Sequence, residues 1–395
     1  MKNVVGNPAR GENFFPRERE IQKVINRIEG GNNLQIAAPR RIGKTSILFY
    51  LLDNKVEGYT YVYVDTERVD NEQEYYKKLL KEIVKVESIS KSTKLAGLLQ
   101  KGGRFLSKVK SIKVLGQELD FNDEEKATDY YEELGNFLSG FQLEGDTKLV
   151  LLIDEFPQTI LNIVEANEGD LRQATQFLQS NRELRHNPEI NSKVQFIYTG
   201  SIGLNHTVSA INASAFINDL NSVEVEPLTY HEGFKLVKQL LTDKGIIIDK
   251  DAVDTLLKKV DWLIPFHIQL ALQEVINLAY GSDKVDAALV NKAFDRIVEA
   301  RNNNHFEHYY RRLKSQFKGE EFKYVDELLQ RLATEGTLER SRLYDISVAF
   351  KLEERYRHII EILGYDGYIN NTGTTNTYRF NSPIVRMWWQ KFICK

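Results

Sequence analysis

Cysteine is nearly absent from this 395-residue chain. Its single cysteine, Cys394, excludes an internal disulfide framework and a cysteine-ligated metal site. No stretch approaches the roughly 18 consecutive apolar residues of a membrane span, and the first residues lack the apolar core of a signal peptide. Low-complexity segments and internal repeats are absent as well. We therefore expect a cytoplasmic protein with no membrane partner.

A dominant charge of one sign is also missing. The chain has 53 lysines and arginines against 56 aspartates and glutamates, a net charge of −3, so no overall field attracts nucleic acid. The distribution is less even, because residues 301–395 carry 16 basic and 12 acidic side chains. This mildly basic end is a weak indication of a polyanionic partner.

The length is sufficient for two or three domains, and 42% hydrophobic residues are enough for real cores. The chain is organised around residues 34–46. An apolar run there predicts a short buried strand, a turn rich in proline and arginine follows, and an apolar helix begins near Lys44. The segment matches the phosphate-binding pattern G-x-x-x-x-G-K-[ST], except that Ala38 replaces the first glycine.

The chemistry of phosphate binding explains this spacing. Loop N–H groups and a helix N-terminus form an anion cradle, and Gly43 lets the backbone approach the phosphates. Lys44 would neutralise the β- and γ-phosphates, and the Thr45 hydroxyl would bind Mg²⁺. A purely structural helix start explains the lysine poorly, because its charge opposes the helix dipole. The predicted nucleotide-binding residues of this loop are Pro39, Arg40, Arg41, Ile42, Gly43, Lys44, Thr45 and Ser46.

A second motif is Lys148 followed by the apolar run at residues 149–153 and then by Asp154 and Glu155. The run predicts a central parallel strand buried on both faces. Its carboxylates would emerge at the carboxyl edge of the sheet, where such sheets bind ligands. We expect Asp154 to hold the Mg²⁺ through water and Glu155 to orient or deprotonate the attacking water. An Asp-Glu pair after a strand is otherwise a common loop start.

Another buried strand at residues 193–199 ends in polar residues. The hydroxyls of Thr199 and Ser201 would lie beside the tip of the Asp154 strand and sense the γ-phosphate or orient water; a plain turn is the alternative. Arg182 or Arg185, at the end of the helix predicted at 170–186, could be an arginine finger for a neighbouring subunit. Surface arginines on helices are common, which is the simpler interpretation.

Two further residues are candidates for contacts with the nucleotide base. Phe15 precedes an amphipathic helix, where an aromatic either staples the helix start or lines the adenine pocket. Pro265 opens a predicted helix, which is ordinary for proline, or it presses on the base.

The predicted elements suggest three domains. Residues 1–227 form an α/β P-loop ATPase domain with a parallel sheet, and helices near 230–243, 250–260, 266–280 and 286–300 form a helical lid at 228–300. A connecting helix at 301–319, helices at 320–334, 338–348 and 352–363, and a hairpin at 363–380 indicate a winged helix within 301–395. A hairpin is also expected around Gly116, and lysines in 101–113 could touch a polyanion or form a solvated face.

Together these segments resemble the archaeal-type ATPases of the STAND branch of AAA+ proteins, which join a P-loop domain, a lid and a winged helix. The resemblance rests on Phe15-Pro-Arg-Glu-Arg-Glu, Ala38-Pro-Arg-Arg-Ile-Gly-Lys-Thr-Ser, Leu152-Ile-Asp-Glu-Phe, Tyr198-Thr-Gly-Ser-Ile-Gly, Trp262-Leu-Ile-Pro and the Ser382-Pro…Trp388-Trp389 ending. By this resemblance Pro265 matches the proline of a lid Gly-x-Pro motif that meets the nucleotide, although Leu263 replaces its glycine. Some relatives carry a C-terminal nuclease domain, which is not expected here.

The resemblance implies a slow ATPase with ATP or ADP and Mg²⁺ as ligands. We expect a nucleotide-dependent switch that signals through the winged helix to a protein partner or by self-association. One alternative is an ATPase resembling replication initiators or transposition regulators, whose winged helix binds double-stranded DNA; Arg340 and Arg342 would contact phosphates there, beside Glu339 and Asp345. A second alternative is an interaction module that does not bind DNA.

Overall fold

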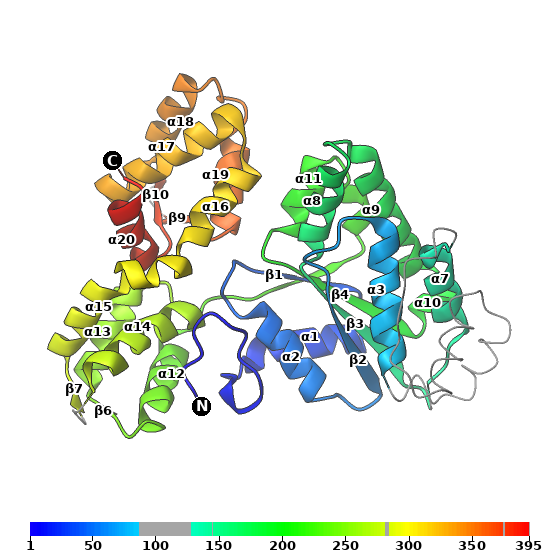
Figure 1. Cartoon of the computed structure of the whole chain (residues 1–395), viewed down its shortest axis with the longest axis horizontal. Coiled ribbons are helices and arrows are strands. Elements are labelled where there is room, and N and C mark those ends of the chain that lie inside the picture. Colours follow the sequence, from blue (N-terminus) through cyan, green and yellow to red (C-terminus); the bar gives the residue numbers. More distant parts are fainter. Residues whose placement is uncertain (87–127, 144, 281–283, 374–375, 395) are drawn as a thin grey trace. The chain divides into compact units, whose positions relative to one another are not determined.

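The computed structural model of the chain describes residues 1–86, 128–143, 145–280, 284–373 and 376–394. The chain divides into two compact units (Figure 1). The sheet unit comprises Arg17–Ala37 and Lys44–Val225. The C-terminal unit comprises Met1–Pro16, Ala38–Gly43 and Glu226–Lys395. The hairpin expected around Gly116 and the lysines of 101–113 lie outside the described residues.

The sheet unit is built on five parallel strands in the order β2-β3-β4-β1-β5. Runs of β-branched and aromatic residues favour these strands, and β3 and β4 are buried almost throughout, as expected for central strands. The strands are β1 (Leu34–Ala37), β2 (Tyr59–Asp65), β3 (Lys148–Asp154), β4 (Val194–Thr199) and β5 (Asn221–Glu224). The α/β class predicted from the motifs is therefore confirmed.

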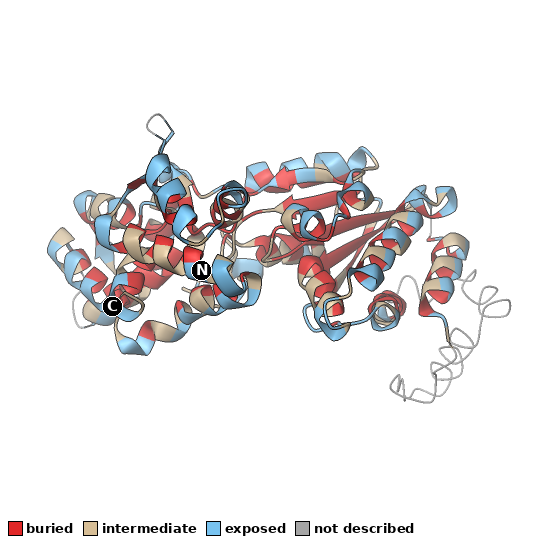
Figure 2. Ribbon diagram, turned by 90° about the horizontal axis from the view of Figure 1, so that it is seen from above, coloured by how far each residue is buried: buried red, intermediate tan, exposed pale blue. Residues whose placement is uncertain are grey.

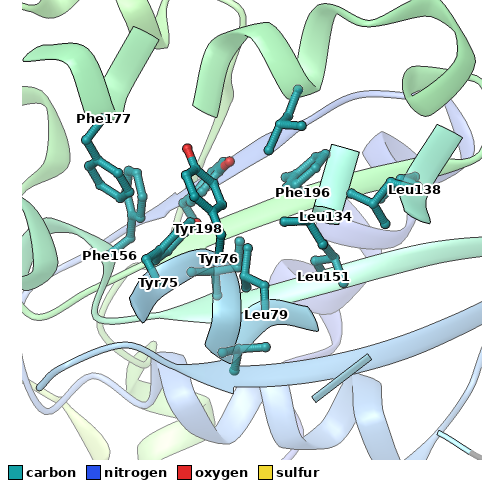
Figure 3. Packing of buried hydrophobic residues seen from close by; sticks show 14 of the residues in the cluster. Tyr75, Tyr76, Leu79, Leu134, Leu138, Leu151, Phe156, Phe177, Phe196 and Tyr198 are labelled. Atoms are coloured by element: carbon teal, nitrogen blue, oxygen red, sulfur yellow. The ribbon is translucent and has the colours of Figure 1, made fainter. Parts of the chain in front are cut away.

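Helices cover both faces of this sheet. Alternate residues of β3 point to opposite sides: Leu149, Leu151 and Ile153 belong to a core shared with α3, α7, α8, α9 and α11. Figure 3 shows part of this core, with Leu151 among its labelled residues. The buried sides of α1 and α2 contribute no residue to that core and face the other side of the sheet. The helices are α1 (Glu18–Glu29), α2 (Lys44–Asp53), α3 (Glu72–Lys85), α7 (Tyr130–Gly140), α8 (Phe156–Ala166), α9 (Leu171–His186), α10 (Pro188–Asn191) and α11 (Leu204–Ala210).

The first part of the C-terminal unit contains the four helices predicted for a lid. They are α12 (Tyr230–Thr242), α13 (Lys250–Val260), α14 (Pro265–Leu278) and α15 (Ala287–Ile297), with a short parallel pair of strands, β6 (Ile247–Ile248) and β7 (Lys284–Val285). A capping box begins α12, because Thr229 and Glu232 satisfy each other's backbone N–H groups. Burial follows one side of α12, α13 and α15, whereas α14 is buried around most of its circumference. Figure 2 colours the described residues by burial.

The rest of this unit has the helices and the hairpin on which the prediction of a winged helix rests. They are α16 (Glu307–Gln316), α17 (Gly319–Glu335), α18 (Arg340–Ala349), α19 (Tyr356–Tyr365) and α20 (Pro383–Phe392), with the antiparallel strands β8 (Leu338–Glu339), β9 (Ile369–Asn371) and β10 (Thr377–Phe380). Leu338 and Glu339 pair with β10, so α18 begins two residues later than predicted.

The single connecting helix predicted at 301–319 is wrong. A 3₁₀ helix (Ala300–His305) precedes α16, and the chain bends at Phe306. Asparagine is a weak helix former, and the asparagines here bond elsewhere: Asn302 donates to Glu274 Oε1 at 3.0 Å, and Asn303 accepts from the Trp388 indole at 2.8 Å. These side-chain bonds hold the segment out of a regular helix.

The lid helices and the 301–395 region belong to the same compact unit, which begins at Glu226, close to the predicted boundary at 227/228. Arg379 of β10 forms a 2.6 Å ion pair with Asp261, at the end of α13. The separation of a lid at 228–300 from a winged helix at 301–395 remains a prediction. None of the helices in the described ranges is both long and apolar enough to cross a membrane.

Candidate active site

The phosphate-binding loop predicted at residues 38–46 has the expected local structure. Strand β1 ends at Ala37, a turn follows, and α2 begins at Lys44. Gly43 has φ +105°, a backbone conformation that side-chain-bearing residues rarely adopt, so glycine is required there. Lys44 lies in the first turn of α2 and is 7% exposed. Ser46 and Ile42 are buried, which ties both ends of the loop to packed side chains.

The turn Ala38–Gly43 is held by the C-terminal unit, to which it belongs. Arg41 adopts the left-handed conformation with φ +68°. Its Nη1 donates to the carbonyl of Gly6 at 2.9 Å, and its guanidinium lies 4.6 Å from the ring centre of Phe266. The Arg41 side chain is therefore engaged in packing, and what it offers a phosphate is its backbone N–H.

The two candidates for base contact lie in the same unit as this turn. Phe15 is half-buried in the segment before α1, and Pro265 is half-buried at the first position of α14. The predicted loop residues of this unit are Pro39, Arg40, Arg41, Ile42 and Gly43. Contact of Phe15 or Pro265 with a base remains a prediction.

In the sheet unit, the two motifs meet at the carboxyl edge of the sheet. The Thr45 hydroxyl donates a 2.8 Å hydrogen bond to Asp154 Oδ2, although 109 residues separate them. The Tyr63 hydroxyl donates to the same oxygen at 3.2 Å, and the Glu155 N–H donates to Oδ1 at 3.1 Å. A hydroxyl and a carboxylate are hard oxygen ligands of the kind that Mg²⁺ takes beside substrate phosphates. Thr45 and Asp154 therefore fit the predicted metal site.

Burial of Asp154 is the main reason that its pKa is raised to about 6. The negative charge of Glu155 adds to the increase. Hydrogen bonds from Thr45 and Tyr63 and the positive charge of Lys44 oppose it. A carboxylate held this way lacks a counter-charge strong enough to offset its burial, which is the situation that a bound cation corrects.

Glu155 and the residues that end β4 lie together. Glu155 Oε2 accepts hydrogen bonds from both the N–H and the hydroxyl of Ser201, each at 2.9 Å. Thr199 is the last residue of β4 and is 3% exposed, and its Oγ1 has no hydrogen-bond partner among the described residues. The structure thus brings Glu155, Thr199 and Ser201 to the edge that carries Asp154, as predicted.

Arg185 is placed differently from the prediction. Its side chain is buried in the sheet unit, where Asp219 accepts from Nε at 2.7 Å and from Nη2 at 2.8 Å. Nη2 also donates to the carbonyl of Phe216 at 2.6 Å. An arginine finger must reach a neighbouring subunit from the surface, so the interpretation of Arg185 as a finger is corrected to a structural ion pair. Arg182, on the same helix, is half-buried.

Sequence reasoning did not identify Tyr63 and Gly200 as part of this site. The run at residues 59–65 predicted a strand, but its register against β3 could not be deduced, so Tyr63 had no predicted partner. Gly200 lies so close to α8 that a Cβ there would be 2.5 Å from Pro157 Cδ. A glycine between two polar residues at a strand end is the signal that could have indicated this close approach.

The sequence matches no family model and no curated protein. Solved structures do resemble the chain. One is the Walker-type ATPase paby2304 of Pyrococcus abyssi, with a TM-score of 0.63, 17% identity, and coverage of 98% of this chain and 99% of that one. Another is the ORC2 protein of Aeropyrum pernix in ADPNP-ADP complexes, with a TM-score of 0.53, 13% identity, and coverage of 96% and 94%. At these identities the likeness shows a shared fold, that of an α/β P-loop NTPase with a helical C-terminal region.

Proposed function

We propose that this protein binds Mg-ATP and hydrolyses it slowly, by phosphoryl transfer to water. One observation carries the proposal: the Thr45 hydroxyl meets the Asp154 carboxylate at 2.8 Å, directly beside Lys44 and Glu155. A P-loop threonine and a strand-end aspartate that share one oxygen-lined position are the pair that holds Mg²⁺ against the nucleotide phosphates. Thr45 and Asp154 would hold the ion, which would supply positive charge beside the phosphates to offset the charge that develops as the γ-phosphoryl group is transferred.

Each side chain then has a separate role. Lys44 neutralises the β- and γ-phosphates, and the backbone N–H groups of the loop and of the first turn of α2 bind phosphate oxygens. Glu155 orients the attacking water and accepts its proton. Because Lys44 acts on binding and Glu155 on the chemical step, the two roles can be tested independently.

The test uses two variants with matched controls. We expect Lys44→Ala to abolish nucleotide binding, whereas Glu155→Gln keeps binding and stops turnover. Lys55→Ala, just beyond the other end of α2, and Glu165→Gln, at the far end of α8, remove the same groups at exposed positions and should behave as the wild type. Nucleotide affinity and phosphate release are measured for all four variants. Turnover retained in both Lys44→Ala and Glu155→Gln would contradict the assignment of the active site.

The proposed biological role is a STAND-type regulatory switch, with residues 301–395 acting as a winged helix that reports the nucleotide state to a protein partner. The supporting observation is that the loop turn Ala38–Gly43 packs with this region, since Pro39 lies against Gly367 of the turn before β9. A change in the conformation of the turn on nucleotide binding would therefore act directly on the rest of the C-terminal unit. Limited proteolysis of that unit with and without Mg-ATP tests this; identical cleavage in both states argues against a switch.

Binding of double-stranded DNA is the second candidate. Helix α18 exposes Arg340 and Arg342 on its surface, and Tyr344 is 44% exposed on the same helix. Arginines on an exposed helix of a winged helix can contact DNA phosphates. We would titrate labelled duplex DNA with the protein, with and without Mg-ATP, at two salt concentrations. Tight, salt-sensitive binding that is lost in an Arg340→Ala, Arg342→Ala variant supports this candidate, and no binding favours a protein partner.

A further inference from the structure

Glu155 is held in an unusual backbone conformation. It precedes α8 with φ +59° and ψ +29°, in the left-handed region, and its side chain does not cap the helix. A non-glycine residue is uncommon there, and such positions persist only where the surroundings fix them. The neighbours on either side, Asp154 and Phe156, are buried, and the ring centre of Phe156 lies 4.5 Å from that of Tyr198. This packing is visible in Figure 3.

Ser201 uses both of its hydrogen-bond donors on Glu155. The backbone N–H and the hydroxyl each donate to Oε2 at 2.9 Å. Among the described residues, both of the hydrogen bonds to the Glu155 carboxylate go to Oε2. Oε2 is therefore fixed by two donors, and Oε1 remains available for another group.

Gly200 makes this arrangement possible. A Cβ at this position would lie 2.5 Å from Pro157 Cδ and 2.9 Å from Pro157 Cγ, and it would be 3.5 Å from Glu155 Oε2. Any side chain there would push the turn after β4 away from the start of α8. The distance between Ser201 and Glu155 thus depends on a glycine at 200.

The Thr199 hydroxyl differs from that of Ser201 in its position and in its hydrogen-bond partners. Residues 153 and 198 are paired between β3 and β4, so Thr199 follows at the level of Asp154, inside the sheet edge. Its hydroxyl is buried and has no partner among the residues described. The two hydroxyls that the sequence offered as equivalent sensors are therefore not equivalent: one is committed to Glu155, and the other is not.

We propose that Ser201 is a positioning residue that holds the general base, and that it does not read the γ-phosphate itself. The inference rests on the proposed function. With Oε2 fixed, Glu155 accepts the water proton through Oε1. The water oxygen forms the bond to the γ-phosphorus, the bond to the bridging oxygen breaks, and ADP leaves with that oxygen.

Ser201→Ala tests the inference, because it removes the hydroxyl and leaves the backbone donor. A hydrogen bond to a charged group contributes roughly 1.5 kcal/mol or more, so the turnover number should fall about tenfold. The affinities for ATP and for ADP should stay within about twofold of the wild type. Ser201→Thr keeps the hydroxyl and should restore most of the turnover, which a merely structural defect would not allow.

Thr199→Val is the matched variant at the other hydroxyl, with a similar shape and no Oγ1. A sensor of the γ-phosphate changes the ratio of ATP to ADP affinity. If Ser201→Ala changes that ratio and leaves the turnover number intact, Ser201 is a sensor and the inference is overturned.

The outcomes distinguish failure of the proposed function from failure of this inference alone. A wild-type protein that does not hydrolyse ATP, or a Lys44→Ala variant that still binds it, removes the proposed function and this inference together. Hydrolysis that depends on Lys44 but is indifferent to Ser201→Ala removes the inference alone.

Discussion

Arg185 lies inside the sheet unit, where both nitrogens of its guanidinium that face Asp219 donate to that carboxylate. Removing one partner of a buried pair leaves the other charge without compensation, which typically costs 3–5 kcal/mol. Because the Asp219 side chain is 14% exposed, we expect Arg185→Ala to lower the free energy of unfolding by about 3 kcal/mol. Urea unfolding measures this, and the change should appear in the midpoint.

Arg182→Ala is the matched control, because Arg182 lies on the same helix but is only half-buried. Substitutions away from buried pairs usually change stability by about 0.5 kcal/mol or less. The opposite pattern, a stable Arg185→Ala protein that has lost ATP turnover, would restore the arginine-finger interpretation. From the sequence the two arginines were indistinguishable, since their difference is the three-dimensional approach of Asp219.

One buried histidine of the C-terminal unit, His267, and one half-buried histidine, His308, should make its stability depend on pH. Burial lowers the pKa of His267 to about 3 and that of His308 to about 2, and nearby arginines add to both decreases. For His308 these are Arg40, Arg41 and Arg312. The unfolded chain takes up a proton at each histidine below its ordinary pKa of about 6.5, whereas the folded chain does not. Stability is therefore complete above about pH 6.5 and is lost as the pH falls.

The size of this effect follows from proton linkage. Each histidine contributes a slope of up to about 1.4 kcal/mol per pH unit, so the pair should contribute roughly 2 kcal/mol between pH 6 and pH 5. Replacing both by glutamine should remove this part of the slope, whatever it does to the absolute stability. Unfolding free energies at pH 5, 6 and 7 provide the measurement; equal slopes in the two proteins would contradict the prediction.

Among the structural elements, the turn that contains Gly367 connects α19 to β9 and contacts the phosphate-binding loop. Gly367 has φ +81°, and a Cβ there would lie 2.6 Å from Trp262 Cη2 and 2.9 Å from Pro39 Cβ. Gly367→Ala therefore combines backbone strain with overpacking, each costing about 1–3 kcal/mol. We expect a loss of about 2–4 kcal/mol in stability and weaker nucleotide binding, because Pro39 is displaced.

Gly245→Ala controls for the backbone alone. Gly245 also has a positive φ, +70°, but open space surrounds the position of its Cβ. The Gly245→Ala protein should lose only about 1 kcal/mol of stability, from the backbone conformation alone, and should keep its nucleotide affinity. Equal effects of the two substitutions on stability and on affinity would mean that the contact with Pro39 and Trp262 is unimportant.

The elements themselves were largely predictable. Strong apolar runs such as 149–153 specify a central strand, and the periodic segments 230–243 and 250–260 specify α12 and α13 almost to the residue. Several short elements were missed, among them α11 and the paired strands β6 and β7. Helix α8 follows the Asp154 motif without a polar cap, and Pro157 in its first turn is a local signal of a helix start that the prediction did not use. The 3₁₀ helix at 300–305 depends on side-chain bonds of Asn302 and Asn303 to distant partners, which the local sequence does not show.

At the scale of the whole molecule, the order of strands β2-β3-β4-β1-β5 explains why the candidate site could be predicted only in part. The motifs at Lys44 and Asp154 identify two strand ends, and parallel strands bring such ends to one edge. The strand that separates β1 from β3 is β4, which carries Thr199 and Ser201. Which of those hydroxyls meets Glu155 depends on the register and on Gly200, and neither can be derived from composition or periodicity.

A bound nucleotide should stabilise the whole chain if the site is assembled as proposed. A ligand that binds only the folded state stabilises it by RT ln(1 + [L]/Kd), about 2.7 kcal/mol at a concentration of 100 Kd. We therefore expect Mg-ADP to raise the midpoint of thermal unfolding of the wild type and of the control Lys55→Ala. Removing the metal with EDTA should reduce the shift, because Thr45 and Asp154 then lose the cation that they would hold.

Two variants decide what such a shift means. Neither Mg-ADP nor Mg-ATP should raise the midpoint of thermal unfolding of Lys44→Ala, since the phosphates lose their counter-charge. Asp154→Asn should keep the metal-independent part of the increase and lose the part that EDTA removes, because an amide is a weaker ligand for Mg²⁺ than a carboxylate. An undiminished shift in Lys44→Ala would place nucleotide binding elsewhere on the molecule. A shift in Asp154→Asn that still responds to EDTA as the wild type does would remove Asp154 from the metal site while leaving the phosphate-binding loop intact.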